Sequence, residues 1–256
     1  LQTITQIGTG NYNENTAKMY TDFSLITADE RIGRDALHFF NNMAMSDLNG
    51  NYEELLVAPN GLKNQILEKI DLEIMKVQMG QPGMITMKFN SLTDREIIDK
   101  FAQASAAGVK IRLIIRGICC LKAGVPGLSE NISVRSIVGN FLEHSRIFYF
   151  FNDGSPEVYM GSADWMPRNL DKRVEILFPV ECEKLKKEAR HILDVQLEDN
   201  VKASILQADG TYEKIDKRGK ALVNAQEYFC QEAVLRAGKP EEQESERVFI
   251  PEEAIE

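Results

Sequence analysis

A histidine and an arginine stand two residues apart in the segment LEHSRIFYFF, as His144 and Arg146. Side chains two apart on a β-strand point to the same face, so this pair could reach one bound phosphate. The arginine offers a fixed fork of hydrogen-bond donors, and the histidine can act as a nucleophile or exchange a proton near neutral pH. The spacing therefore predicts phosphoryl chemistry on one face of a strand.

A glycine-led segment of fifteen residues occurs twice in the chain. GSADWMPRNLDKRVE begins at Gly161, seventeen residues after His144, and GTGNYNENTAKMYTD begins at Gly8. Both copies continue with a small hydroxyl residue, reach an aromatic at the fifth position and end on a carboxylate, Asp22 or Glu175. Small residues let the backbone approach an anion closely, and we expect Glu175 to hold the imidazole of His144 by a charge-assisted hydrogen bond. The sequence therefore predicts a repeated half-site.

Composition and charge narrow the class of protein. The chain has 256 residues, of which 43% are hydrophobic and 27% charged, as is usual for soluble globular proteins. The net charge is -9, but seven glutamates and one arginine in residues 241–256 account for -6 of it. We expect an acidic tail over 237–256, and anion binding must come from local clusters of Arg and Lys. No apolar run could span a bilayer and no leader pattern opens the sequence, so we expect a cytoplasmic protein.

The four cysteines show no CxxC spacing and have no histidine at ligand spacing. This pattern favours neither a zinc site nor a disulfide framework, and we expect buried, reduced thiols.

Strand and helix patterns alternate over residues 54–117 and predict a parallel α/β sheet. Arg116 follows a buried strand at its carboxyl end, where open α/β sheets place their ligands. The intervening helix should begin at a capping box from Thr93 to Glu96 and end at Gly108. A turn-rich linker at 49–54 marks a domain boundary.

The rest of the chain shows further strand and helix patterns. A turn at 152–154 should join two of the strands into a hairpin. The expected strands are 3–10, 132–138, 143–151, 156–164 and 173–180, a short hairpin covers 201–215, and the expected helices are 28–43, 181–199 and 217–238.

The pair of His144 and Arg146, together with the glycine-led segment, resembles the phospholipase D superfamily, in which two half-sites face each other across a pseudo-twofold axis. The longer segments IGTGNYNENTAKMYTDFSLITAD, IRLIIRGICCL, FLEHSRIFYF and GSADWMPRNLDKRVEI resemble the carboxyl-terminal part of bacterial polyphosphate kinase of the phosphohistidine type. The resemblance runs from about residue 7 to about residue 234. It implies an α/β fold with a phospholipase D-like mixed sheet flanked by helices, divided into the remnant of a first half (1–52) and a complete second half (53–236).

The resemblance also implies roles for individual residues. His144 matches a histidine that acts as acid or base, Glu175 the carboxylate that orients it, and Asp22 the carboxylate that orients a nucleophilic histidine. Tyr20 matches an aromatic that stacks on adenine. Arg116 and Arg173 match phosphate ligands, and on charge and placement we add Arg146, Arg168 and Lys88.

The same resemblance implies ATP, ADP and polyphosphate as substrates, with Mg²⁺ accompanying ATP. It further implies a homo-oligomer in the intact protein and a peripheral membrane association, and no nucleic-acid partner. The sequence identifies no metal ligands.

The repeat also predicts which histidine is missing. The counterpart of His144 should precede Gly8 by at least seventeen residues, which places it before residue 1. The family has a histidine directly before IGTGN, and this chain has Gln6 there, which cannot accept a phosphoryl group. We therefore expect the 256-residue chain alone to be inactive.

Two other functions fit the same residues. The chain could be a non-catalytic polyanion-binding or assembly module, or a phosphodiesterase of the phospholipase D type. The key residues also have structural interpretations: His144 as a satisfied strand residue, Arg116 as an ion-paired strand end, and Tyr20 as part of the core.

Overall fold

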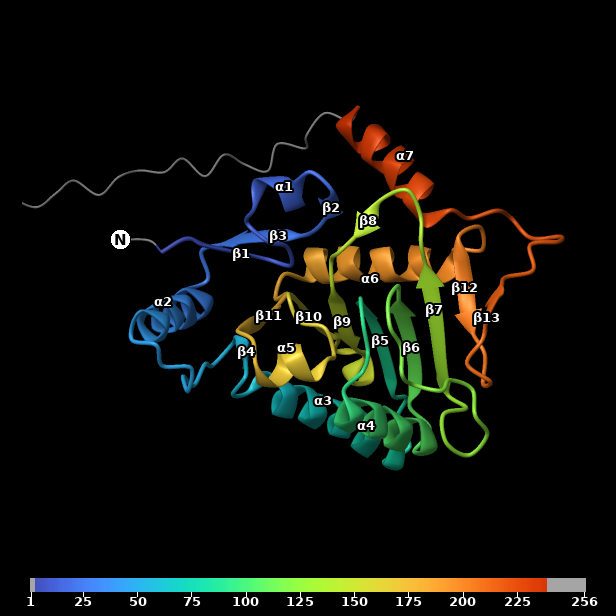
Figure 1. Ribbon diagram of the computed structural model, residues 1–256, viewed down its shortest axis with the longest axis horizontal. Helices are drawn as coiled ribbons and strands as arrows, with labels where there is room; N and C mark the ends of the chain where they lie inside the picture. The colour runs from blue at the N-terminus through green and yellow to red at the C-terminus, as the bar shows by residue number, and fades with distance from the viewer. Residues whose placement is uncertain (1–2, 239–256) are drawn as a thin grey trace, which may run out of the picture.

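A nine-stranded mixed sheet forms the centre of the computed structural model, which describes residues 3–238 (Figure 1). Its strand order is β13-β12-β7-β6-β5-β9-β10-β11-β4. The strands are β4 (Leu56–Ala58), β5 (Met84–Phe89), β6 (Lys110–Ile115), β7 (Ile132–Ile137), β9 (Ile147–Phe150), β10 (Glu157–Gly161), β11 (Glu175–Pro179), β12 (Ala203–Leu206) and β13 (Tyr212–Lys214).

Only the middle of the sheet is parallel. β5, β6 and β7 run in one direction, and every other neighbouring pair is antiparallel. β4 lies at the far edge against β11 instead of beside β5, because three strands from later in the chain insert between them. The mixed α/β sheet flanked by helices is confirmed. The expected strands β4, β5 and β6 do run in one direction, because four successive antiparallel pairings separate β4 from β5, but β4 is not a neighbour of β5 as a purely parallel sheet would require.

Alternating side chains give the sheet two cores. On β5 and β9, Met87 and Phe148 belong to a core that includes Phe101 of a covering helix. Ile147, the neighbour of Phe148, points to the opposite face and packs in a core with Leu193. Helices α3 (Leu62–Gln78) and α4 (Arg95–Ala106) cover the first face and α6 (Glu183–Glu198) covers the second.

Two helix ends differ from the sequence expectation. The N-cap of α4 is Asp94, whose carboxylate accepts from the backbone N–H of Ile97, so the box from Thr93 to Glu96 does not form. Gly108 does end this helix, with a positive φ of 101° that favours glycine. The last helix, α7 (Ala225–Ala237), is shorter than expected and begins after Asn224.

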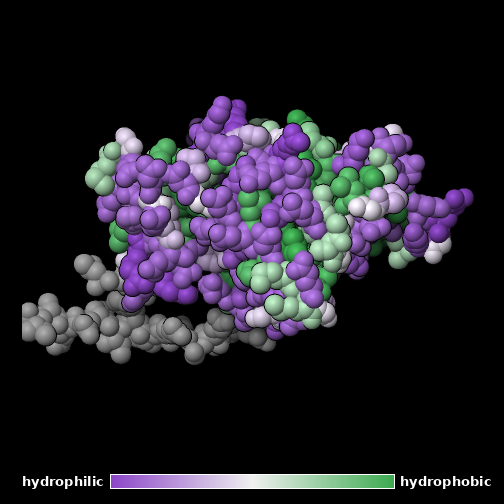
Figure 2. All heavy atoms as spheres, turned by 90° about the horizontal axis from the view of Figure 1, so that it is seen from below, coloured by the Kyte–Doolittle hydropathy of each residue, from purple (hydrophilic) through white to green (hydrophobic). Residues whose placement is uncertain are grey.

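The surface on the side of α3 and α4 is mostly hydrophilic, with hydrophobic residues in short strips (Figure 2). None of the helices within residues 3–238 combines the length and apolar character needed to cross a bilayer. The four cysteines are free as expected, but Cys120, Cys182 and Cys230 are exposed, so the expectation of burial is wrong for them. From residue 239 on, the expected acidic tail lies outside the described residues.

The sequence repeat is confirmed in the backbone. Strand β1 (Thr5–Gly8) pairs antiparallel with β3 (Ser24–Thr27), aligning Gly8 with Ser24, and β10 pairs with β11, aligning Gly161 with Leu177. Both pairs are separated by sixteen residues, so the two hairpins have the same register.

Side-chain hydrogen bonds repeat at the same positions. Thr9 Oγ1 accepts from the N–H of Phe23 at 2.9 Å while Thr9 N–H donates to Phe23 O at 3.0 Å. Ser162 and Ile176 make the equivalent pair at 3.2 and 3.1 Å. A small hydroxyl residue is needed after the glycine because it bonds back to the second strand of the hairpin.

The correspondence includes a short helix inside each copy and a long helix after it. Short α1 (Glu14–Ala17) matches α5 (Pro167–Asp171), and long α2 (Glu30–Ala44) matches α6, with Glu30 and Glu183 at equivalent starts. The repeat therefore covers about forty residues rather than fifteen.

The two copies differ in what covers them. Trp165 is fully buried against Phe89 and Phe148 of the large sheet, whereas its counterpart Tyr12 is 75% exposed. β1 pairs only with β3 within the described residues, so no strand stands beside it as β9 stands beside β10.

Gly161→Ala should destabilise the chain. An added Cβ would lie 2.0 Å from the backbone oxygen of Ile176, which cannot move without opening the hairpin. We expect the free energy of unfolding to fall by about 1 to 3 kcal/mol or more, as for other overpacked sites. Urea unfolding followed by fluorescence of the single, buried Trp165 measures this.

Gly238→Ala is the matched control, because an added Cβ there meets its nearest atoms at 3.7 Å and φ is -84°. Equal stability of the two variants would contradict the close hairpin approach.

Candidate active site around His144

The site lies where the two repeats meet. β2 (Tyr20–Thr21), from the first copy, pairs parallel with β8 (Leu142–Glu143). Directly after β8, the backbone N–H groups of His144 and Ser145 both donate to Thr21 O, at 3.0 and 3.2 Å. The segment that carries His144 is therefore held by residues more than 120 positions earlier.

His144 is half-buried between an amide and an aromatic ring. Asn90 Nδ2 lies 3.4 Å from Nδ1 of the imidazole, and the Tyr20 ring lies 4.8 Å from it, centroid to centroid, at 42°. Because Tyr20 contacts the imidazole in this way, the structure brings these two predicted site residues together.

Burial lowers the pKa of His144 to about 4, and the nearby guanidinium of Arg146 adds to this effect. Arg116 acts in the same direction, while the carboxylates of Asp22 and Asp164 oppose it. The imidazole is consequently neutral at neutral pH.

Arg116 keeps most of its hydrogen-bonding capacity free. Its Nε donates to Asn90 Oδ1 at 2.7 Å, and among the described residues neither terminal nitrogen has a partner. The side chain is half-buried at the carboxyl end of β6, as expected. A planar guanidinium with two free nitrogens is suited to bind a phosphoryl group.

Arg146, by contrast, is almost fully occupied. It is 4% exposed and donates from Nε and Nη2 to Asp164 at 3.2 and 3.0 Å. Its Nη1 donates to the carbonyl oxygens of Thr9 and His144 at 3.3 and 3.0 Å. Since four of its five N–H groups are used, these contacts do not support the expected role of Arg146 as a phosphate ligand.

Lys88 is buried and bonded to the same segment. Its Nζ donates to Ser145 O at 2.8 Å and Ser145 Oγ at 3.1 Å, and lies 3.7 Å from Glu143. Burial lowers the pKa of Lys88 to about 8, which the Glu143 carboxylate partly opposes. Lys88 thus supports the backbone next to His144 and has little left for a ligand.

No hydrogen bond or ion pair within the described residues joins three of the predicted residues, Glu175, Arg168 and Arg173, to the imidazole. Glu175 accepts from Asn169 Nδ2 at 2.5 Å, and no hydrogen bond within the described residues joins it to His144. Arg168 and Arg173 are exposed and without hydrogen-bond or ion-pair partners in the described part of the chain, so both remain available to a ligand.

Sequence reasoning missed Asn90 and Asp164. Asp164 belongs to the repeated segment, where its position could have suggested a role, and its Oδ1 also accepts from Asn90 N–H at 2.7 Å. Asn90 carries no motif signal. Asp22 is placed by Thr9, whose hydroxyl donates to its Oδ1 at 2.7 Å.

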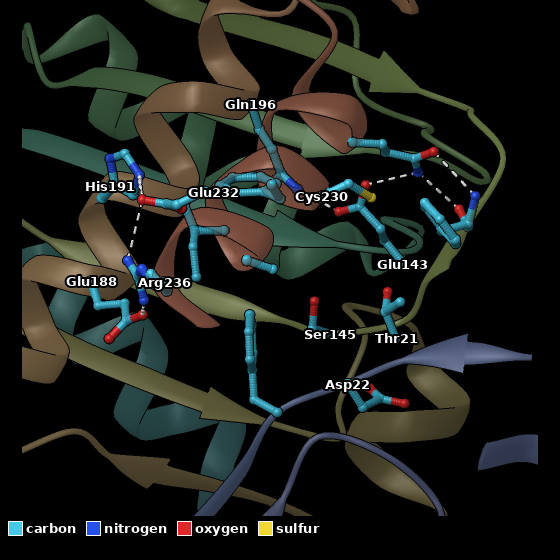
Figure 3. Close-up of a pocket in the computed structure, with 16 residues that line it drawn as sticks. Thr21, Asp22, Glu143, Ser145, Glu188, His191, Gln196, Cys230, Glu232 and Arg236 are labelled. Carbon is cyan, nitrogen blue, oxygen red and sulfur yellow. Dashed lines mark hydrogen bonds and ion pairs between the residues drawn. The ribbon is translucent and has the colours of Figure 1, made fainter. Parts of the chain in front are cut away.

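A cavity of about 420 Å³ adjoins this site between α6, α7 and β8 (Figure 3). Carboxylates of Asp22, Glu143, Glu188 and Glu232 line it, and its one arginine, Arg236, already pairs with the last two. The acidic lining disfavours phosphate here, so an anion should approach His144 from the side of Arg116.

The described residues contain no cluster of three or more His, Cys, Asp or Glu side chains able to hold a metal ion.

The comparisons with known proteins identify the family. A family model described as Polyphosphate kinase C-terminal domain 2 matches residues 55–226, and one described as Polyphosphate kinase C-terminal domain 1 matches residues 1–49. The chain belongs to the polyphosphate kinase family. The resemblance expected from the sequence is confirmed.

Relatives and a solved structure agree. The polyphosphate kinase of Staphylococcus haemolyticus is 49% identical over 91% of the chain, and that of Lactiplantibacillus plantarum is 48% identical over 89%. The crystal structure of polyphosphate kinase from Porphyromonas gingivalis has a TM-score of 0.85 and 38% identity, covering 91% of this chain and 36% of that one. The chain spans about a third of the length of the curated relatives, 32% in both cases.

Asp164→Asn should destabilise this member of the polyphosphate kinase family strongly. Removing one partner of a buried ion pair leaves the Arg146 charge uncompensated, at a cost of about 3 to 5 kcal/mol. Urea unfolding measures the loss. Asp99→Asn is the matched control, because its partner Arg95 has a 93% exposed side chain and we expect little change in stability. Equal losses of unfolding free energy in the two variants would contradict the role of the buried pair.

The low pKa of His144 should make folding stability depend on pH. The unfolded imidazole binds a proton near pH 6.5 and the folded one only near pH 4. Between these values the unfolded state binds more protons, so stability is complete above pH 6.5 and falls as the pH drops toward 4. Urea unfolding across this range should show a shallower loss for His144→Gln. Equal pH dependence of the two proteins would contradict the shift.

Proposed function

We propose that this chain is the carboxyl-terminal catalytic region of a polyphosphate kinase that transfers the terminal phosphoryl group of ATP reversibly to polyphosphate through a phosphohistidine. The observation that supports this most is the neutral imidazole of His144 joined through Asn90 to Arg116, whose two terminal nitrogens have no partner in the described part of the chain. This is a donor set suited to a phosphoryl group, in a chain of the polyphosphate kinase family.

The proposed reaction has two balanced steps. A histidine nitrogen attacks the γ-phosphorus of ATP, forming a P–N bond as the P–O bond to ADP breaks. A terminal oxygen of polyphosphate then attacks the same phosphorus, forming a P–O bond as the P–N bond breaks. The chain has three histidines, His38, His144 and His191, and none takes the place in the first repeat that His144 takes before the second. We therefore assign the attacking histidine to sequence that the longer relatives have in addition.

The residues of this chain would stabilise the transferring group. Negative charge spreads over the phosphoryl oxygens in the transition state, and preorganised donors aimed at them are the main source of catalysis. Arg116 would supply two such donors and His144 a third, while exposed Arg173 and Arg168 would bind the polyphosphate or nucleotide phosphates. Tyr20 would stack on adenine. Glu175 accepts from Asn169 in this structure, and it would orient His144 only after its side chain had left Asn169.

Mg²⁺ would arrive with the phosphates of ATP, since this chain offers no ligand cluster of its own in the described residues. The proposal assigns no step to the metal. We further propose that the intact protein is cytoplasmic and homo-oligomeric and acts on ATP, ADP and polyphosphate. It would associate peripherally with the membrane and have no nucleic-acid partner.

The test uses the intact polyphosphate kinase that contains this region. Arg116→Ala should lower kcat/KM by roughly 100 to 1,000-fold, because one arginine removes donors to the transition state. His144→Gln should lower it by roughly 100 to 10,000-fold. Phosphate transfer from radiolabelled ATP to polyphosphate measures both.

Arg95→Ala, which removes the same charge at an exposed site, is the control and should retain activity. The 256-residue chain alone should take up no acid-labile phosphate from ATP. If polyphosphate binding persists and the intact His144 variant keeps full activity, the polyanion-binding module is the correct function instead. Hydrolysis of a phosphodiester would favour the phosphodiesterase.

A further inference from the structure

The side-chain amide of Asn90 connects Arg116 to His144, and its orientation is determined. Arg116 Nε carries a hydrogen and can only donate, so the Asn90 atom 2.7 Å away must be the oxygen. The NH₂ group of the same amide therefore faces Nδ1 of His144, at 3.4 Å. A flipped amide would set two donors against each other at the arginine.

The Asn90 side chain has little freedom to escape this arrangement. The residue is 8% exposed, and its backbone N–H is held by Asp164 Oδ1 at 2.7 Å. Asp164 is in turn paired with Arg146. The amide is consequently supported at both the backbone and the side chain.

The orientation of the amide determines where His144 carries its proton. An NH₂ group donates, so Nδ1 of the imidazole must accept and cannot carry hydrogen. A neutral imidazole has one N–H, which must then be on Nε2. Asp22 and Asp164, the carboxylates near the ring, make no hydrogen bond to the imidazole within the described residues, so they do not oppose this tautomer.

We propose that Arg116 and Asn90 form a relay that holds His144 in the Nε2–H tautomer, so that His144 presents a hydrogen-bond donor to a phosphoryl oxygen and cannot itself be phosphorylated on Nε2. This deepens the proposed function, on which its relevance to phosphoryl transfer rests. Asn90 is a positioning residue in this scheme, since it acts through the imidazole.

The relay gives two histidines of one reaction opposite roles. A nucleophilic histidine needs a free nitrogen lone pair toward phosphorus, which a carboxylate accepting from the other nitrogen provides. An amide that donates to Nδ1 has the opposite effect, because it leaves the proton on Nε2. The Asn90 amide therefore suits His144 to donate from Nε2 rather than to attack phosphorus.

The tautomer can be read directly from multiple-bond ¹H–¹⁵N NMR of the 256-residue chain at pH 7.5, which separates protonated from unprotonated ring nitrogens. His144→Gln assigns the signals among the three histidines. In the wild-type chain we expect an unprotonated Nδ1 and a protonated Nε2. Protonated Nδ1, or a mixture of tautomers, would overturn the proposal.

Asn90→Asp provides the decisive comparison, because free imidazole also favours Nε2–H to some extent. A carboxylate can still accept from Arg116 but can no longer donate, so the proton should move to Nδ1 and the pKa of His144 should rise. Asn15→Asp makes the same change at an exposed site and should leave His144 unaltered. An unchanged tautomer in Asn90→Asp would also overturn the proposal.

Arg116→Leu tests the relay without altering Asn90. Its amide loses the donor that orients it, and a mixture of His144 tautomers should appear, whereas Arg95→Leu should show none. Fluorescence of buried Trp165 verifies folding of each variant. Because these measurements read protonation at named atoms, they can succeed even if the activity tests of the proposed function fail.

Discussion

The buried ion pair of Arg146 and Asp164 is the interaction on which the rest of the site depends. Arg146 leads into β9, and Asp164 follows β10 in the glycine-led loop. The remaining bonds of the two residues extend to Thr9 in the first repeat, to the carbonyl of His144 and to the backbone of Asn90. One pair of opposite charges therefore connects both repeats to the end of β5, and the imidazole is placed by the same set of bonds.

The two copies of the repeat explain how a few contacts can position the residues of the site. Each copy is a hairpin in which a glycine passes close to the opposite strand and the next hydroxyl bonds back to it. Only the second copy is covered by the large sheet, which buries Trp165 and leaves its counterpart Tyr12 exposed. The first copy nevertheless contributes Tyr20 and the Thr21 carbonyl to the site, so the two copies act together although their surroundings differ.

Charges of both signs surround His144. The cavity of Figure 3 is lined by carboxylates, whereas Arg116, joined to His144 through Asn90, has two terminal nitrogens without a partner in the described residues. Arg146 and Lys88 supply positive charge from inside the protein without being accessible to a ligand. Burial, with Arg146 adding to it, lowers the pKa of His144 and keeps the imidazole neutral, while Arg116 keeps donors that can meet a phosphoryl group.

The sequence by itself determined most strands and helices around the site, the hairpin turn at 152–154 and the position of Arg116 at a strand end, because periodicity and turn chemistry are local properties. The expected strand over 143–151 is wrong at the site itself, since residues 144–146 lie between β8 and β9 and belong to neither, so His144 and Arg146 do not share one face of a strand. It also determined the repeat, which the paired registers of Gly8 and Gly161 confirm. Only the tertiary structure decided which cations keep free donors. Arg146 and Lys88 looked as suitable for phosphate as Arg116, but their donors are taken by groups as far away as 137 residues along the chain. Asn90 was likewise invisible in the sequence, since its role arises from hydrogen bonds to two side chains that only folding brings to it.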